Sequence, residues 1–420
     1  METYADILLI AIPGFLVLVI IELFYGAWKQ NQTYTLMDTI SSLSSGMTNL
    51  LKDIFGVGVV IISYPFLMDN LALFTIEESK WVYLIAFICI DFASYWGHRL
   101  NHSINVFWNQ HVVHHSSEEF NLACALRQSI SGLIGFGALF LLPAAVLGVP
   151  AKIITILAPL HLFGQFWYHT RHIGKMGWLE YLLVTPSQHR VHHAINPEYI
   201  DKNLSAIFCV WDRLFGTFQE ELDDVPCVYG TLKPVHTWNP ILINFQHLWG
   251  LCTDAWNTQN WSDKLKLWFM PTGWRPKDVA ERYPRKSIDD VYTQQKYAPT
   301  YTLKHKIIAV FQFVSVNVFL YLFLSNFGTL TPVARIAYGI LIFMSIFGYT
   351  SLLDGNRWGL IFEITRAIIG IIIVFHPFNT DQWTSAYALL SGLTLYFIIT
   401  LATSLWIAQS LPKRGLVPSS

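Results

Sequence analysis

Three short histidine motifs are the part of this sequence best suited to chemistry. Imidazoles three or four positions apart lie on one face of a helix, where they can reach a common metal ion. Eight imidazoles exceed the four ligands that zinc typically takes, so they fit two metal ions held close together, with positions open for a substrate or oxygen. Imidazole suits iron, zinc and copper alike, so the ligand type leaves the metal open. The motifs are an HxxxH with His98 and His102, an HxxHH with His111, His114 and His115, and a second HxxHH with His189, His192 and His193.

Four further residues are candidates for the same site. His169 ends an apolar stretch and is predicted as a further metal ligand or a neighbour of one. Asp91 lies seven positions before His98, on the same helical stripe, so we expect its carboxylate to accept an N–H from a ligand histidine. The alternative is pairing with a hydroxyl group of another helix. Glu118 and Glu119 follow the second motif and are predicted to ligate metal or relay protons, with a plain surface role as the alternative.

The composition indicates a membrane protein. Hydrophobic residues make up 53% of the 420 positions, charged residues 13%, and the mean hydropathy is +0.40. A soluble domain of this length carries more charge, so the bilayer is the expected solvent. A net charge of -1 gives no reason to expect nucleic acid as a partner. The five cysteines form no CxxC pair, which favours a reduced compartment or simple burial.

The apolar stretches predict an all-α integral membrane protein, a multi-span helical bundle. A helix needs roughly 20 apolar residues to cross the hydrocarbon layer. The fourth and fifth stretches, separated only by Pro150, are candidates for partial embedding instead of full crossing. The nine predicted spans are Ile7–Tyr25, Leu50–Met68, Trp81–Gly97, Ile130–Val149, Ile153–Tyr168, Ile307–Leu324, Val333–Leu353, Leu360–Phe375 and Tyr387–Ala408.

Counting the predicted membrane crossings then indicates on which side of the membrane the histidines lie. If every span crosses, all three motifs lie on one side, together with residues 169–306. Short loops on that side carry Lys29 and Arg99, whereas Glu77 and Glu78 lie opposite, so the excess of basic residues predicts that the motifs face the cytosol. The expected architecture is a membrane bundle with a cytosolic, histidine-rich helical cap that holds a dinuclear metal site. The predicted domains are 1–79 (N-terminal membrane helices), 80–255 (histidine-motif domain), 256–306 (cytosolic extension) and 307–420 (C-terminal four-helix membrane region).

The motifs resemble those of the fatty acid hydroxylase and sterol desaturase superfamily. Beyond the histidines, five runs are similar to the alkylglycerol monooxygenase family. The resemblance is strong over most of residues 80–255 and looser over the N-terminal and C-terminal spans. The runs are HVVHHSSEEFNLACALRQS (111–129), TPSQHRVHH (185–193), IDKN (200–203), WDRLFGTF (211–218) and VYG (228–230).

The resemblance implies a chemistry and a set of partners. It implies two irons held by the eight motif histidines, dioxygen as oxidant, tetrahydrobiopterin as electron donor, and alkylglycerols or lyso ether lipids as substrates. Hydroxylation of the carbon next to the ether oxygen gives a hemiacetal, which collapses to a fatty aldehyde and a glycerol. Ser103 stands where the family typically has glutamate, which makes another electron donor an alternative. The expected membrane is the endoplasmic reticulum in a eukaryote or the inner membrane in a bacterium.

Other functions use the same residues. Sterol, fatty acid or carotenoid hydroxylation or desaturation would need the same metal centre. A metal transporter is a more distant alternative, because histidine clusters also mark ion paths. Transporters place their ligands near the bilayer midplane, between broken helices, whereas these motifs lie beyond the predicted helix ends.

Overall fold

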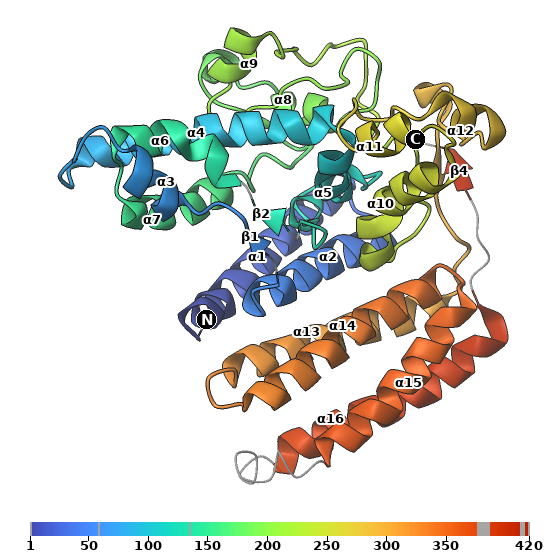
Figure 1. The fold of residues 1–420 in the computed structure, drawn as a ribbon. Helices are drawn as coiled ribbons and strands as arrows, with labels where there is room; N and C mark the ends of the chain where they lie inside the picture. The colour runs from blue at the N-terminus through green and yellow to red at the C-terminus, as the bar shows by residue number, and fades with distance from the viewer. Residues whose placement is uncertain are drawn as a thin grey trace. The chain divides into compact units, whose positions relative to one another are not determined.

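The structure, a computed structural model, describes residues 2–57, 59–132, 134–135, 137–375, 387–411 and 416–418. Helices dominate this part of the chain, as predicted, together with two short two-stranded sheets that the sequence did not predict (Figure 1). The chain forms two compact units. Unit 1 comprises residues 1–56, 236–243 and 293–420, and unit 2 comprises residues 57–235 and 244–292.

Unit 1 contains the long apolar helices. Its core is one hydrophobic cluster built from α2, α13, α14, α15 and α16. Strands β3 and β4 pair antiparallel, with Tyr297 opposite Leu416. The elements of unit 1 are α1 (Glu2–Trp28), α2 (Leu36–Ile54), β3 (Gln295–Tyr297), α13 (Leu303–Ser325), α14 (Pro332–Leu353), α15 (Arg357–Val374), α16 (Tyr387–Ile407), η6 (Ala408–Ser410) and β4 (Leu416–Pro418).

Four segments of unit 1 are long and apolar enough to cross a membrane, so the protein is an integral membrane protein. They confirm four of the nine predicted spans. The segments are Ile7–Trp28, Leu303–Ser325, Pro332–Leu353 and Gly392–Ser410.

A buried polar cluster links three of the helices of unit 1. Glu363 and Arg366 of α15 are fully buried and form an ion pair, with Arg366 Nη2 2.7 Å from Glu363 Oε2. Gln312 of α13 accepts a hydrogen bond from Arg366, and so does Tyr396 of α16. Charged groups in an apolar bundle are costly unless they are paired, and here every charge has a partner.

Unit 2 contains all the histidine motifs. Strands β1 and β2 pair in parallel, and α10 (Pro240–Asn257) enters this unit at Asn244. The other elements are β1 (Val59–Val60), α3 (Tyr64–Leu71), α4 (Lys80–Ser103), α5 (Asn105–His115), η1 (Cys124–Leu126), β2 (Ile134–Gly135), η2 (Gly137–Leu141), α6 (Leu142–Leu147), α7 (Ala151–Phe163), η3 (Gly177–Tyr181), α8 (Pro186–His193), α9 (Val210–Phe215), α11 (Trp261–Lys266), α12 (Lys277–Arg282) and η4 (Val291–Thr293), which ends one residue beyond the unit.

Local sequence signals fix the helices that carry the motifs. Helix α8 begins with Thr185, whose side chain accepts a hydrogen bond from Gln188 N, and with Pro186 at the first helical position. Both are favourable residues for a helix start. Helix α4 packs on η2, α6 and α7 through a cluster of buried apolar side chains, which anchors the N-terminal half of α4. The two HxxxH histidines therefore lie in the last two turns of a helix whose first half is held by apolar packing.

Two of the predicted spans are wrong as continuous helices. In Leu50–Met68, α2 ends at Ile54, and β1 separates it from α3. In Ile130–Val149, a strand, a 3-10 helix and the six-residue α6 replace the expected span. Gly148 ends α6 with φ +77°, and a Cβ at this position would lie 1.9 Å from the carbonyl oxygen of Phe74, so only glycine fits. A stretch of apolar residues does not by itself show whether the chain forms one continuous helix there.

The three remaining predicted spans have other outcomes. The stretch Ile153–Tyr168 yields α7, which has 13 residues and is too short to cross the hydrocarbon layer. The stretches Trp81–Gly97 and Leu360–Phe375 are helical in α4 and α15, and their crossing stays a prediction. The count of sides assumed nine crossings, so the cytosolic placement of the motifs also stays a prediction, as do the four predicted domains.

Candidate metal centre

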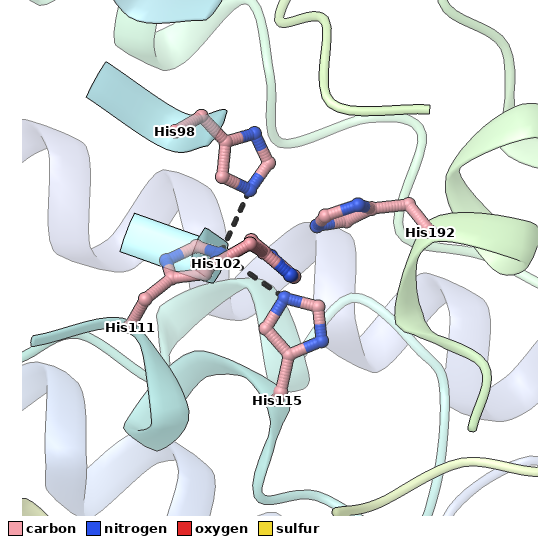
Figure 2. A group of neighbouring side chains, drawn as sticks. All are labelled: His98, His102, His111, His115 and His192. Atoms are coloured by element: carbon pink, nitrogen blue, oxygen red, sulfur yellow. Dashed lines mark hydrogen bonds between the residues drawn. The ribbon is translucent and has the colours of Figure 1, made fainter. Parts of the chain in front are cut away.

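Nine histidines converge in two groups in unit 2. In each group one possible ligand atom per residue lies within 4.8 Å of the corresponding atoms of the others. Figure 2 shows the rings of the larger group pointing toward one another from separate segments. The five-histidine group is His98, His102, His111, His115 and His192, and the four-histidine group is His114, His169, His189 and His193. The structure thus brings together all nine predicted histidines, including His169, which lies outside every motif, and their role as metal ligands stays a prediction.

Helical spacing explains how each HxxHH motif serves both groups. In α5, His111 and His115 are four positions apart and enter the five-histidine group, whereas His114 enters the other group. In α8 the assignment is reversed, because the outer histidines of the motif enter the four-histidine group and His192 enters the five-histidine group. The two groups are adjacent, since the rings of His115 and His193 are stacked with centroids 4.4 Å apart.

The nitrogen separations fit ligands of one ion. At a metal–nitrogen distance of about 2.1 Å, two ligands at a right angle lie about 3.0 Å apart and two at the tetrahedral angle about 3.4 Å apart. Four of the five close pairs match the right angle better, which favours a metal of higher coordination number than tetrahedral zinc. The Nε2–Nε2 distances are 2.8 Å (His98–His111), 3.0 Å (His111–His115), 3.3 Å (His114–His169), 2.8 Å (His169–His189) and 3.0 Å (His189–His193).

The opposite ring nitrogen of five histidines is held by an acceptor oxygen. Because a carbonyl or carboxylate oxygen only accepts, each Nδ1 carries the hydrogen and Nε2 is left with its lone pair. Three of these acceptors belong to the short segment 201–204. The pairs are His98 with Leu204 O (2.8 Å), His102 with Asp201 Oδ1 (3.0 Å), His192 with Lys202 O (3.0 Å), His114 with Arg127 O (3.3 Å) and His169 with Gln165 O (3.0 Å).

This tautomer pattern leaves lone pairs that a cation in the site would satisfy. His114 and His169 both carry hydrogen on Nδ1, so two lone pairs face each other across the 3.3 Å between their Nε2 atoms. The Nε2 atoms of His102 and His192 are buried without a hydrogen-bond partner among the described residues. Buried acceptors left in this way are costly unless they bind a ligand. The residues present therefore fit bound metal ions.

Burial keeps the imidazoles in the form that binds metal. Burial, with smaller contributions from neighbouring histidines, lowers the pKa of His98 to about 3 and that of His114 to about 3. The same causes lower the pKa of the following residues well below the ordinary value: His111, His115, His169, His189, His192 and His193. At neutral pH these rings are uncharged, which is the state in which imidazole coordinates a metal.

Aromatic rings pack around the four-histidine group. The ring of Tyr168 lies 4.2 Å from that of His189, measured between centroids. Phe120 stacks between His169 at 5.8 Å and Tyr229 at 5.1 Å. Such a lining excludes water and lowers the local dielectric, which strengthens electrostatic interactions inside the site.

Asp91 does not contact a histidine of either group, so the predicted contact is wrong. Its carboxylate, fully buried, accepts a hydrogen bond from His161 Nε2 at 2.7 Å. It also accepts from the backbone nitrogens of Ile207 (2.9 Å) and Phe208 (3.1 Å) and from Trp211 Nε1 (2.8 Å). Asp91 thus holds the segment that follows residues 201–204, instead of orienting a ligand directly.

Glu118 and Glu119 are not members of either histidine group. Both have interactions with other groups, and Glu119 is buried. Their predicted role as ligands finds no support in the geometry of the described residues, and a role in proton transfer stays a prediction.

Sequence reasoning missed the residues that shape segment 201–204. Asp201 (φ 55°) and Asn203 (φ 52°) adopt the left-handed conformation that Asp and Asn tolerate better than most residues. Asp212, buried, accepts hydrogen bonds from Leu204 N (2.7 Å) and Ser205 N (3.0 Å). The run IDKN, noted only for its resemblance, was the available signal, because two such residues flanking a lysine indicate a special backbone turn.

Comparison with known proteins places this geometry in a family. The sequence pattern of the fatty acid hydroxylase family matches residues 83–217, which contain all nine histidines. The alkylglycerol monooxygenase of Homo sapiens is 32% identical over 380 residues, which are 89% of this chain and 83% of that protein. That of Danio rerio is 31% identical over 420 residues (96% and 89%), and that of Xenopus tropicalis is 38% identical over 264 residues (62% and 58%). No solved structure matches the chain significantly.

The chain belongs to the alkylglycerol monooxygenase family. The resemblance found in the sequence is confirmed by relatives that match over most of their length. As a member of this family, the protein is an oxidoreductase, a lipid monooxygenase of the fatty acid hydroxylase superfamily in an integral membrane protein.

Proposed function

We propose that this protein is a di-iron monooxygenase that cleaves the ether bond of alkylglycerols. The observation that carries the proposal is the convergence of nine imidazoles in two adjacent groups, in a chain whose long relatives are alkylglycerol monooxygenases. The proposed ligands are the five histidines of the first group and the four of the second. Two irons bound there would supply the activation of dioxygen that a monooxygenase needs.

The proposed reaction hydroxylates the carbon next to the ether oxygen. One oxygen atom of dioxygen enters that C–H bond, and two electrons and two protons reduce the other to water. The product is a hemiacetal, whose C–O bond to glycerol breaks as the hydroxyl proton moves to the leaving oxygen, giving a fatty aldehyde and a glycerol. The C–H bond is the weakest of the alkyl chain because the ether oxygen lone pair stabilises the carbon radical.

The protein side chains have three tasks in this proposal. Burial keeps the imidazoles neutral, so that they can bind metal at physiological pH. Segment 201–204 fixes the orientation of three ligand rings through its acceptor oxygens. Phe120 and Tyr168 exclude water beside the four-histidine group, which protects reactive species from side reactions.

Three carboxylates have proposed supporting roles. Asp91 is a positioning residue, because it holds Ile207 and Phe208 just beyond segment 201–204. Glu118 and Glu119 are proposed proton carriers, since they follow the last helical histidine of α5 by three and four positions.

The side of the membrane, the type of membrane and the electron donor are also part of the proposal. We place the histidine groups in a cytosolic cap, on the excess of Lys and Arg in the short loops of that side. The membrane is the endoplasmic reticulum in a eukaryotic host or the inner membrane in a bacterial one. The electron donor is proposed to be tetrahydrobiopterin. Ser103, which replaces the glutamate typical of the family, donates to the carbonyl oxygen of Arg99 and makes another donor the alternative.

A product assay tests the proposal. Membranes containing the full chain are incubated with an alkylglycerol labelled in its alkyl chain, with and without reduced pterin, and fatty aldehyde is measured. We expect labelled aldehyde that requires dioxygen and a reductant and that disappears after chelation and returns with ferrous iron. Parallel incubations with a sterol, a free fatty acid and a carotenoid identify the substrate class.

Three results would decide against it. Hydroxylated sterol, fatty acid or carotenoid without any aldehyde would leave a monooxygenase of the superfamily with another substrate. Full activity without added pterin, supported by a ferredoxin or another donor, would show that tetrahydrobiopterin is not the electron donor. Metal uptake into sealed vesicles without lipid oxidation would favour a transporter.

A further inference from the structure

Helix α10 exposes an apolar face in unit 2. Phe245, Trp249, Cys252 and Trp256 are all exposed, and they follow one another at intervals of four, three and four positions. This spacing places them on one side of the helix. Trp256 is 85% exposed and Trp249 75%, which is unusual for the largest apolar side chain.

The same apolar surface continues beyond α10. Trp261 (75% exposed), Leu265 (72%) and Phe269 (68%) follow at intervals of four positions, in α11 and the turn after it. Figure 1 shows α10 and α11 as consecutive helices of the chain. Together we name these side chains the tryptophan face: Phe245, Trp249, Cys252, Trp256, Trp261, Leu265 and Phe269.

The opposite side of α10 carries buried polar side chains, beside the buried apolar residues Ile243 and Leu251, and hydrogen bonds lock it into unit 2. The Oδ1 atom of Asn244, fully buried, accepts from Ile130 N at 2.8 Å. His247 Nε2 donates to Asn105 O at 2.9 Å. Asp254, 1% exposed, binds the guanidinium of Arg275 through both oxygens at 2.8 and 2.9 Å.

Helix α10 therefore differs from a helix on a water-exposed surface, because it also turns large apolar side chains outward. A helix on a water-exposed surface turns its apolar side inward and its polar side to water. Here three polar or charged side chains are satisfied inside, and Trp and Phe are outside. Since the inner face is fixed by hydrogen bonds, rotating the helix would break them and would bury an unpaired carboxylate. The medium outside the helix must be one that accepts Trp and Phe.

Basic side chains border the tryptophan face. Lys264 Nζ donates to the carbonyl oxygens of Ala255 and Trp256, which ties α11 to the end of α10, and it lies 5.4 Å from the ring centroid of Trp261. Lys266, about half exposed, forms an ion pair with Asp263 at 2.6 Å and lies 5.4 Å from the ring of Trp274, so Lys264 is the lysine of this border that has no carboxylate partner among the described residues. Exposed tryptophans with lysines at their edge are typical of the layer between lipid headgroups and acyl chains.

We propose that the tryptophan face is immersed in the interfacial layer of a lipid bilayer. It would bind the membrane surface without crossing it, in addition to the membrane-spanning helices of unit 1. Its occupant is the bilayer surface itself, where Trp side chains reach the acyl boundary and the lysines remain among the phosphates. A second protein copy is the competing occupant, and the basic border favours phosphate groups over an identical, equally basic surface.

Cys252 provides a reporter inside the face. It is the exposed cysteine among the five, since Cys89, Cys124 and Cys209 are buried and Cys227 is partly buried. The full-length protein is reconstituted into phosphatidylcholine and phosphatidylserine vesicles and labelled at Cys252 with an environment-sensitive fluorophore. We expect blue-shifted emission, strong quenching by spin-labelled lipids, and quenching by aqueous iodide that is several-fold weaker than at a water-exposed site.

The matched control carries Cys252→Ser together with Asp223→Cys. Asp223 is 89% exposed and makes a surface ion pair with Lys175, so its replacement leaves the fold intact. The label at position 223 should be quenched by iodide and not by lipid. Two results would overturn the proposal: iodide quenching at Cys252 equal to that at position 223, or protection from both quenchers that disappears when the protein is diluted in lipid, which indicates contact between copies.

Discussion

At the scale of single residues, the centre depends on which nitrogen of each imidazole carries the hydrogen. Acceptor oxygens fix Nδ1–H in five of the nine rings and turn the Nε2 lone pairs inward. One of these acceptors is a side chain, the carboxylate of Asp201, which is 59% exposed. The others are backbone carbonyls, which a substitution does not remove. Asp201 is therefore the acceptor that mutation can test.

We predict that Asp201→Gly weakens metal binding without unfolding the protein, since glycine suits the left-handed backbone at this position. His102 would lose the partner that fixes its tautomer, and loss of such a contact typically costs about 10–100-fold in metal affinity. The affinity is measured by competition with a chromogenic chelator in the purified full chain. The matched control is Asp223→Gly, at an exposed aspartate whose ion-pair partner is Lys175. Equal affinities of the two variants would show that Asp201 does not position His102.

We also predict that His114→Ala and His192→Ala each abolish product formation. The two residues belong to different groups, and a monooxygenase with two cooperating metals needs both. Aldehyde formation from a labelled alkylglycerol is measured, with His236→Ala as the control, since His236 lies in unit 1 and in neither group. Normal turnover in one of the two variants would show that its histidine group is not needed for the reaction.

Sequence reasoning identified the candidate ligands better than their surroundings. Helical spacing shows which histidines of one motif share a face, and the structure brings the eight motif histidines together with His169, which belongs to no motif. The same spacing placed Asp91 on the stripe of His98, yet its carboxylate binds His161 and Trp211. The residues on one face of a helix do not indicate which distant loop packs against that face. The oxygens of segment 201–204 that accept hydrogen bonds from the histidines lie on such a loop.

At the scale of elements, two buried carboxylates hold the segment that orients three ligands. Asp91 of α4 binds residues 207, 208 and 211, and Asp212 of α9 binds residues 204 and 205. The segment itself has little regular structure. Its geometry therefore depends on hydrogen bonds from neighbouring helices more than on its own backbone pattern.

We predict that Asp91→Asn lowers the free energy of unfolding by about 1–3 kcal/mol. An amide has one acceptor oxygen, so its NH2 group would face N–H donors that now bind a carboxylate. Thermal unfolding of the detergent-solubilised chain measures the loss, and metal affinity should fall as well, because segment 201–204 is released. Asp69→Asn is the control, since Asp69 is exposed on α3. Unchanged stability and affinity would remove Asp91 from the support of the site.

The contact between α10 and the start of α5 should be sensitive to acid. Burial, together with Lys233 and Arg285, lowers the pKa of His247 to about 4, while the hydrogen bond to Asn105 O and Asp254 act in the opposite direction. Between the ordinary value of about 6.5 and about 4, the unfolded chain binds a proton that the folded chain does not. His247 therefore favours the folded state fully above this window and progressively less as the pH falls through it.

We predict that His247→Gln flattens this dependence. Glutamine can still donate to Asn105 O and does not titrate. Unfolding midpoints of both proteins are compared across the window, and the wild type should lose stability relative to the variant as the pH falls. A difference between the two that is independent of pH would contradict the assignment.

The elements themselves were predictable where one apolar run is one helix. The spans in α1, α13, α14 and α16 are of this kind. The runs Leu50–Met68 and Ile130–Val149 failed, because hydropathy is blind to backbone breaks and both contain glycines and a proline. The apolar composition of a segment indicates that it is surrounded by lipid or by protein core. Whether the segment is one continuous helix depends on the backbone preferences of its residues.

At the scale of the whole molecule, the chain divides its tasks between two units. Unit 1 contains all four segments that are apolar and long enough to cross a membrane, and unit 2 contains both histidine groups. The family and the candidate metal-binding residues could be predicted from sequence, because they depend on residue types at fixed spacing. The two-unit organisation could not, since unit 1 joins the two ends of the chain.

The central claim is that the two histidine groups each bind a metal ion. The most direct test is elemental analysis of the full-length protein, purified without chelators from iron-supplied cells and quantified by amino-acid analysis. The account predicts about two ions per chain, with iron as the metal, because five and four imidazoles exceed the needs of one ion. A content close to zero, or to one, in folded protein that still produces aldehyde would contradict it.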